Sequence, residues 1–475
     1  MKNKYLIPLI LSSFILKAQD SHYWSNQFGA KSSLLCGAVV GGVRDISAAY
    51  YNPGALGFVD SITVSVNSDL YKVENLKVKN ALGDGNDMSY YDYGISPQMI
   101  SGLFKIDKRN KFKFGLILLT KTNSNINFNE RVTGENEIFA PNEKIPFVSA
   151  FEYQNNVLDQ WGGASLSYKI NKHISIGTTL FLSYKNVNYR YFRYSRAIAV
   201  FPDSVVSSQT DYQAVSFRTC RFISKTGIAF DFHPLKFGVS FTSQSFGDFL
   251  PGDLLGGSSV QRELSGVNFE DFADELYIEK QDKLPVKQIQ PWSIAAGISY
   301  SFAKFHLFAT AEYFGAIPTY INITPESKEV SLKPQFSKDS KDFLTVYSKS
   351  NAILNYAIGA EWEATKKVHI LSGFSRDNSF SSDFLSQTSE SYNEPIYMPF
   401  SYWNLNNLSL GLNFKRKNNQ FTLGGVYTFS DNTQHRNWIN YNDPNGILLS
   451  SPVQNNASTN YQAINIVVGY IQYIE

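Results

Sequence analysis

The reactive residues of this chain do not stand at catalytic spacings. The sequence contains no His-Glu-x-x-His zinc motif, no Gly-x-Ser-x-Gly nucleophile turn and no paired histidines or cysteines typical of a metal site. Its six histidines are scattered, and serine is too abundant to single out a nucleophile. Cys36 and Cys220 form either one disulfide or two buried free thiols, and their spacing does not decide which. The sequence therefore predicts neither an enzyme nor a cofactor.

Charged residues are the remaining candidates for a site. Several fall on the polar face of segments that otherwise alternate with apolar residues, and would therefore point into an enclosed interior: Asp69, Lys121, Lys185, Lys225, Glu312, Glu361 and Glu363. Such charges either line a polar path or form a network that holds an internal segment in place. The pattern favours the network, and the path stays open as the alternative.

A polar stretch at residues 248–290 holds a second candidate. Phe269, Phe272 and Leu276 stand at helical spacing between acidic residues, which predicts an amphipathic helix in a loop. Its apolar face either forms an external groove for a ligand or partner, or packs on neighbouring loops. The sequence does not decide between these two roles.

The first residues are typical of an export signal. Lys2 and Lys4 precede the apolar stretch Tyr5–Leu16, and cleavage is expected after residues 1–18. No later apolar run approaches the roughly 18 residues of a membrane-spanning helix. Aromatic residues make up 15% of the chain and charged residues 18%, with a net charge of +2. This composition favours a β-rich exported protein and gives no reason to expect nucleic acid as a partner.

Strand-like alternation runs through the rest of the chain. Between residues 292 and 302, large apolar residues such as Ile298 alternate with small ones such as Ser299. The same period of two recurs near residues 112–121, 174–185 and 408–415. A soluble sandwich would show this alternation too, so the pattern by itself predicts strands but not a membrane.

The connections between these strands indicate a membrane barrel. Six joints are short and rich in turn formers or cations: Asp107–Asn110, Asn171–Lys172, His233–Pro234, Ala303–Lys304, Thr365–Lys367 and Lys415–Asn419. They alternate with seven long polar stretches, near residues 73–96, 125–157, 191–217, 248–290, 318–350, 379–403 and 431–460. Short periplasmic turns alternating with long outer loops are typical of transmembrane barrels. Residues 59–475 are therefore predicted to form a 14-stranded antiparallel transmembrane β-barrel with seven long extracellular loops.

The predicted strand centres lie near residues 66, 102, 117, 165, 180, 225, 241, 297, 310, 358, 372, 410, 425 and 469. Their apolar face would touch lipid. Lysine at Ile298 or Leu410 is therefore expected to impair assembly, whereas lysine at Ser299 or Ser409, on the other face, is expected to be tolerated.

Residues 19–58 do not alternate and are expected to fold back into the barrel as a plug. The stretch Asp45 to Leu56, which includes Asn52, Pro53 and Gly54, resembles the hatch motif of the long-chain fatty acid transporter (FadL) family. Gly54 departs from that motif, because an alanine usually follows the proline. Pro53 restricts its own φ and that of Asn52, and Gly54 permits unusual angles, which suits a rigid bend from plug to wall.

The resemblance implies a function in the bacterial outer membrane, in contact with its lipid and lipopolysaccharide. It implies passive uptake of hydrophobic, fatty-acid-like small molecules through the plugged barrel. Some members of the family, such as PorV-like proteins, are instead partners in export or assembly machines. Long aromatic loops with Tyr402, Trp403 and Trp438 would suit docking to other outer-membrane proteins, so this role is the alternative.

Overall fold

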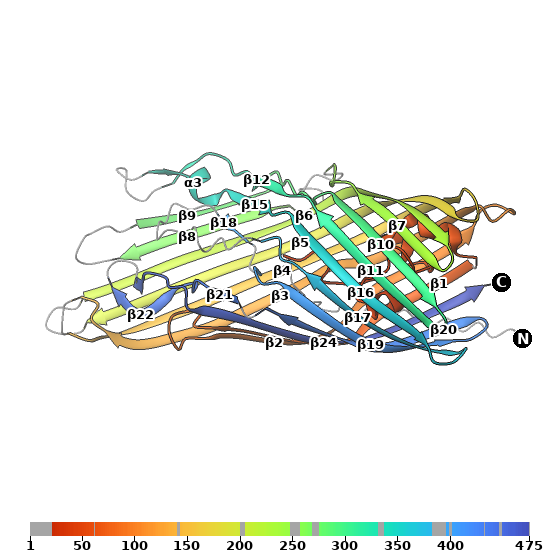
Figure 1. Cartoon of the computed structure of the whole chain (residues 1–475). Coiled ribbons are helices and arrows are strands. Elements are labelled where there is room, and N and C mark those ends of the chain that lie inside the picture. Colours follow the sequence, from red (N-terminus) through yellow and green to blue (C-terminus); the bar gives the residue numbers. More distant parts are fainter. Residues whose placement is uncertain are drawn as a thin grey trace, which may run out of the picture.

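The computed structural model describes residues 21–60, 62–139, 143–199, 205–247, 257–267, 275–330, 337–381, 396–398, 401–431, 433–445 and 449–474. The predicted signal peptide at residues 1–18 lies outside these residues. Figure 1 shows strands running side by side around an elongated barrel, with the N-terminal helices at the end where the C-terminus lies. None of the described helices is long and apolar enough to cross a membrane.

A closed antiparallel ring of 14 strands forms the barrel. In order they are β1 (Ile62–Lys79), β2 (Met88–Lys105), β3 (Phe112–Asn136), β4 (Ile145–Lys169), β5 (Ile174–Ala199), β6 (Val205–Phe232), β7 (Leu235–Thr242), β10 (Ser293–Phe302), β11 (Phe305–Phe314), β16 (Ile353–Glu363), β17 (Val368–Asp377), β19 (Leu405–Lys415), β20 (Asn419–Ser430) and β24 (Ala457–Ile474). Pairing of β24 with β1, from Ile62↔Ile474 to Lys79↔Ser458, closes the ring. The predicted fold class is confirmed, and every predicted strand centre falls inside one of these strands.

The remaining elements lie before the ring or in its long connections. The segment before β1 contains α1 (Ala30–Ser33), α2 (Ala48–Tyr51) and the 3-10 helix η1 (Pro53–Phe58). The connections contain β8 (Ser259–Val267), β9 (Glu275–Asp282), β12 (Ile317–Ile323), β13 (Glu329–Val330), β14 (Lys338–Asp339), α3 (Ser340–Leu344), β15 (Val346–Ser350), β18 (Ile396–Tyr397), β21 (Thr433–His435), β22 (Asn440–Asn445) and β23 (Ser450–Ser451). All six short turns occur where they were predicted.

The outer surface near the short turns carries a band of exposed apolar side chains. Ile298 is 48% exposed and Leu410 is 65% exposed, whereas their neighbours Ser299 and Ser409 are buried. Exposed aromatic residues lie beside the short turns: Phe104, Phe112, Tyr300, Phe302, Phe305, Trp362, Phe414, Phe421 and Tyr470. A second group lies above the band: Tyr71, Tyr93, Trp292, Tyr313, Tyr356 and Tyr427. An apolar band between two aromatic belts is typical of a barrel in lipid.

Beyond this band the strands β3 to β6 continue as a tall wall (Figure 1). The two faces exchange their polarity there. On β3 the inward-facing Ile126 and Phe128 are buried, while Asn127 and Asn129 are exposed. The predicted irregular loops at 125–157 and 191–217 are therefore wrong, because strand pairing extends to Asn136↔Ile145 and to Ala199↔Val205. Polar side chains in these stretches cover the outer face of a wall whose inner face is apolar.

The inner face of this wall is covered by the long connections, which together form a hydrophobic core on the side predicted to be extracellular; we call it the extracellular core. Phe128, Phe151 and Phe217 of the wall pack there with Phe343 of α3 and with Trp403. Tyr402 and Trp438 pack against the same core. These aromatic residues, which were expected to dock a partner, face the interior instead. The expectation of exposed aromatic loops is therefore wrong at these positions.

The predicted helix at residues 269–276 is wrong where it can be compared with the structure. Leu276 lies in β9, opposite Ser265 of β8. Phe269 and Phe272 lie outside the described residues. Both cysteines are free and buried, Cys36 in the N-terminal segment and Cys220 in β6, so the alternative of two free thiols is confirmed.

Replacing Leu410 by lysine puts a charge on the lipid-facing band. We expect the free energy of unfolding in lipid vesicles to decrease by about 2–4 kcal/mol, which means a less stable barrel. Urea titration of the vesicle-folded protein measures this. Asn127→Lys adds the same charge to an outward face above the band and serves as the matched control, with little expected change. Equal losses in the two variants would contradict the lipid-facing assignment.

Candidate functional site

The N-terminal segment, residues 21–60, packs against the inner face of the ring. Its Phe28 and Leu34 are fully buried in a cluster that also includes the wall residues Ile117, Phe181 and Leu371. Because these wall residues come from β3, β5 and β17, the segment touches strands on several sides of the ring. The described residues of this segment therefore pack against several strands of the ring.

Glycines in the wall make room for this segment. A Cβ added to Gly177 would lie 2.4 Å from the Pro53 oxygen, and one added to Gly227 would lie 2.1 Å from Asn52 Oδ1. Six further wall glycines show approaches below 3.0 Å to the same segment: Gly238, Gly297, Gly373, Gly411, Gly424 and Gly469. We call these eight residues the glycine belt. Its backbone atoms touch the segment directly, so any side chain in the belt would push the segment away.

The motif residues Asn52, Pro53 and Gly54 lie against this belt. The Asn52 side chain donates to the oxygens of Val40 and Ile228, each at 3.1 Å, and accepts a bond from the Gly54 N–H at 3.1 Å. Pro53 opens η1, which leads the chain into β1. Asp45, in contrast, accepts a bond from the Ser47 N–H at 2.8 Å within its own segment. Asn52 therefore joins two parts of the segment to the wall.

Ser299 and Ser409 also face the segment. A Cβ on Gly42 would lie 2.5 Å from the Ser299 Cβ, and the Ser409 hydroxyl donates to the Leu34 oxygen at 2.8 Å. The structure leaves no room for lysine at either position. The expectation that lysine is tolerated there is wrong, because the polar face of these strands packs against the N-terminal segment and does not face open water.

Most of the predicted inward charges contact the N-terminal segment. Lys121 donates to the Tyr23 oxygen and, at 2.6 Å, to the Tyr50 hydroxyl. Lys225 lies 4.7 Å from the centre of the Tyr50 ring and 3.9 Å from Glu312. Such contacts are those of a network that holds an internal segment in place, the favoured alternative.

Glu312 and Glu361 extend this network to two other parts of the segment. Glu312 accepts a bond from Trp24 Nε1 at 2.7 Å. Glu361 pairs with Lys31 at 2.6 Å and with the buried His369 at 2.7 Å. Each carboxylate therefore joins a wall strand to the N-terminal segment.

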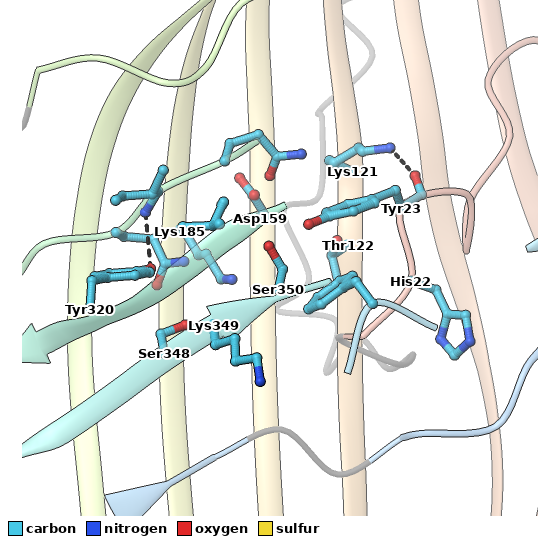
Figure 2. Close-up of a pocket in the computed structure, with 15 residues that line it drawn as sticks. His22, Tyr23, Lys121, Thr122, Asp159, Lys185, Tyr320, Ser348, Lys349 and Ser350 are labelled. Carbon is cyan, nitrogen blue, oxygen red and sulfur yellow. Dashed lines mark hydrogen bonds between the residues drawn. The ribbon is translucent and has the colours of Figure 1, made fainter. Parts of the chain in front are cut away.

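A small polar cavity of about 50 Å³ lies above the segment. Figure 2 shows His22 and Tyr23 of the segment on one side, and Lys185, Tyr320, Ser348 and Lys349 on the other. Lys121 and Asp159 border the cavity from the wall strands. Lys185, another of the predicted inward charges, borders it as well. Apolar surface comes from Ile289, Ile317 and Phe380. The cavity thus combines several cations with apolar side chains.

The carboxylate of Asp159 is committed to its neighbours. It accepts bonds from Arg221 at 3.0 Å, from Trp161 Nε1 at 2.9 Å and from Ser183 at 2.7 Å. Sequence reasoning missed Asp159 and Arg221, although the period of two would have placed both on the inward face. Arg221 pairs with Asp159, and the lining also includes Lys121, Lys185 and Lys349.

The wall is split beside this cavity, which the sequence did not indicate. β2 pairs with β3 only from Met99↔Leu119 to Lys105↔Lys113. Beyond Leu119 the described part of β3 pairs with β4 alone, and the upper part of β2 pairs with β1 alone. The split begins above the outward-facing Ile100 and extends past the exposed Tyr93. This stretch is the upper half of the apolar band.

A bulge in β3 starts this split. Thr120 pairs with Gln160 and Thr122 pairs with Asp159, so Lys121 is an extra residue in its strand. A bulge of this kind bends a strand and redirects a side chain, here into the cavity. Near the split, Asp69 Oδ1 and Gln98 Oε1 are buried without a hydrogen-bond partner among the described residues. Buried polar atoms of this kind are suited to bind water or a polar ligand.

Substituting Gly177 by alanine should disturb the packing of the N-terminal segment, since the new Cβ would lie 2.4 Å from the Pro53 oxygen. We expect a loss of about 1–3 kcal/mol in unfolding free energy and faster protease cleavage of the segment. Gly425→Ala is the matched control, because its Cβ would meet nothing closer than 3.8 Å. Unchanged proteolysis of Gly177→Ala would argue against close packing of segment and wall.

Removing Glu312 should leave Lys225 buried without its ion pair. We expect Glu312→Ala to cost about 3–5 kcal/mol, and the double variant Glu312→Ala/Lys225→Met to recover part of that loss. A double-mutant cycle of unfolding free energies measures the coupling. Additive losses would show that the two charges do not act together.

Comparison with known proteins shows what this barrel resembles. No family model and no curated protein matches the sequence. Among solved structures, the Ralstonia pickettii toluene transporter TbuX matches with a TM-score of 0.56 and 12% identity, over 94% of this chain and 99% of that one. The CymD monoaromatic hydrocarbon channel matches with 0.54 and 11%, over 94% and 98%. A Pseudomonas aeruginosa FadL homologue matches with 0.52 and 11%, over 97% and 99%. The resemblance predicted from the hatch motif is thus confirmed at the level of the fold.

Proposed function

We propose that this protein lies in the bacterial outer membrane and takes up hydrophobic small molecules passively through its barrel. The split between β2 and β3, whose β3 edge lines the cavity at Lys121 and Thr122, is the observation that carries this proposal. The similar structures with the printed names of toluene transporter, hydrocarbon channel and FadL homologue support it.

The proposed route of the substrate depends on which parts of the barrel are closed by packed side chains. The extracellular core packs wall and connections together over the outer end of the barrel, and its large side chains are buried. A hydrophobic solute dissolved in the outer leaflet meets the split instead, and reaches the cavity beside Lys121 and Thr122. From there the N-terminal segment blocks the way to the periplasm, so we assign it the role of a hatch that must shift for release.

The cavity favours a particular class of substrate. Lys121, Lys185 and Lys349 attract a negative charge, while Ile289, Ile317 and Phe380 suit an apolar body. A fatty-acid-like molecule, with one anionic group and a hydrocarbon tail, combines both features. Uptake is preferred to a role as a subunit of an export or assembly complex, because Trp403, Trp438 and Tyr402 pack in or against the core.

Deleting Lys121 removes the extra residue of the bulge and lets β3 continue its pairing with β2. We expect this deletion to abolish uptake of a fluorescent fatty acid by proteoliposomes while the barrel still assembles. The measurement is the initial rate of uptake at equal protein content.

Lys121→Gln is the matched variant, because it keeps the bulge and removes the charge while leaving an amide that can still donate to Tyr23 and Tyr50. We expect it to slow uptake of the fatty acid but to leave uptake of an uncharged aromatic hydrocarbon near the wild-type rate. Full uptake by the deletion variant would contradict a route through the split.

A further inference from the structure

The periplasmic end of the barrel is strongly cationic. The turn from β2 to β3 contains Lys108, Arg109 and Lys111, and the turn from β19 to β20 contains Arg416 and Lys417. These turns lie at the mouth of the barrel where the N-terminal segment ends. None of these residues has a part in the proposed uptake route. The proposed uptake function therefore does not explain their charge.

Like charges also face each other across the strands at this mouth. Lys105 of β2 is directly opposite Lys113 of β3, on the inward face. Lys169 of β4 lies two residues beyond Ser167, which is the partner of Lys113. Directly opposed like charges destabilise a sheet. Lys113 is buried and donates to Asn110, and Lys169 lies 5.6 Å from the centre of the Phe58 ring.

A hollow of about 450 Å³ adjoins Lys105. Its other cations are Lys415, Arg416 and Lys417, and Asp60 is the one carboxylate among the described residues that line it. Asp60 accepts a hydrogen bond from Asn110 at 3.3 Å. Lys415 also lies 3.8 Å from Glu361. Among the described lining residues the cations still outnumber the carboxylates, which favours an anion as the occupant.

The hollow also has an apolar side. Ile474, 47% exposed, stands on the outer face opposite Ile62, while Tyr473 stands on the inner face. The hollow therefore straddles the rim of the wall and connects the lipid side with the mouth of the barrel. An anion that carries an acyl chain would place its headgroup among the cations and its chain along Ile474.

We propose that this hollow binds the phosphate headgroup of an anionic lipid from the inner leaflet of the membrane. Arginine and lysine together supply charge and directed N–H groups for phosphate oxygens. The bound phosphate offsets the repulsion among the lysines of the mouth. The inference rests on the membrane location in the proposed function, but not on the transport of any substrate.

The test uses the full chain, purified in a neutral detergent. It is titrated with fluorescent phosphatidylglycerol and, separately, with phosphatidylcholine of the same chain length. The test variant is Arg416→Gln/Lys417→Gln, and the matched control is Lys366→Gln/Lys367→Gln, which removes two charges from the neighbouring turn outside the hollow. Both pairs lie in turns, so the barrel is expected to fold in each case.

We expect phosphatidylglycerol to bind more tightly than phosphatidylcholine, and the test variant to lose on the order of tenfold in that affinity, since each cation near an anionic lipid contributes several-fold. The control variant should keep its affinity. Equal binding of the two lipids, or equal losses in the two variants, would overturn the proposal.

Inorganic phosphate distinguishes the two sources of the anion. If it leaves lipid binding unchanged at millimolar concentration, the acyl chain contributes to recognition, as proposed. If it displaces the lipid, the hollow is a site for free anions and the lipid assignment is wrong. The uptake rate of the wild-type protein is a separate readout, so failure of the uptake proposal would not be mistaken for failure of this one.

Discussion

Hydrogen bonding of the backbone in hydrocarbon governs this molecule. No water reaches N–H and C=O groups inside a membrane, so a chain without apolar helices can cross only as a closed ring of strands. The pairing of β1 with β24 closes that ring. The missing pairs between β2 and β3 are therefore costly, and they begin beside the bulge at Lys121. A cost of this kind is expected where a solute passes or binds.

The N-terminal segment depends on a second constraint, which is steric. Its backbone reaches the wall because the glycine belt offers no side chains at the points of contact. Charges then fix its orientation, since Glu312 holds Trp24 and Glu361 holds Lys31. Displacing the segment would expose both carboxylates together with the apolar residues around Phe28. In the proposed uptake function, release of a substrate therefore has to offset both kinds of contact.

The fold was predictable because lipid imposes one rule along every strand of the band. Apolar residues such as Ile298 and Leu410 point outward, and short cationic turns mark one end of each hairpin. Above the band the rule inverts, with Phe128 inward and Asn127 outward. A strand with polar residues on its outer face does not match the pattern of a lipid-facing strand. Its sequence is therefore easily taken for a loop. Because of this inversion, the sequence did not predict the tall wall or the core on its inner face.

The candidate site was predictable only in part. The period of two placed Lys121, Lys225, Glu312 and Glu361 inside, and the hatch motif located Asn52 to Gly54. Neither pattern showed what these residues touch, because contacts such as Lys31 with Glu361 or Pro53 with Gly177 join distant parts of the chain. The lysine substitution at Ser409 was misjudged for the same reason. The split was hidden because one extra residue in a strand leaves no mark in composition.

Photolabelling is the most direct measurement of the central claim, which is that hydrophobic solutes reach the cavity sideways through the wall. Intact cells would be exposed to a fatty acid with a photoreactive group at the end of its chain, and the labelled residues mapped by mass spectrometry. The account predicts labels at Gln98 and Thr122 beside the split and at Tyr23, the hatch residue that lines the cavity. Labels confined to the extracellular core, around Trp403 and Phe343, would contradict it.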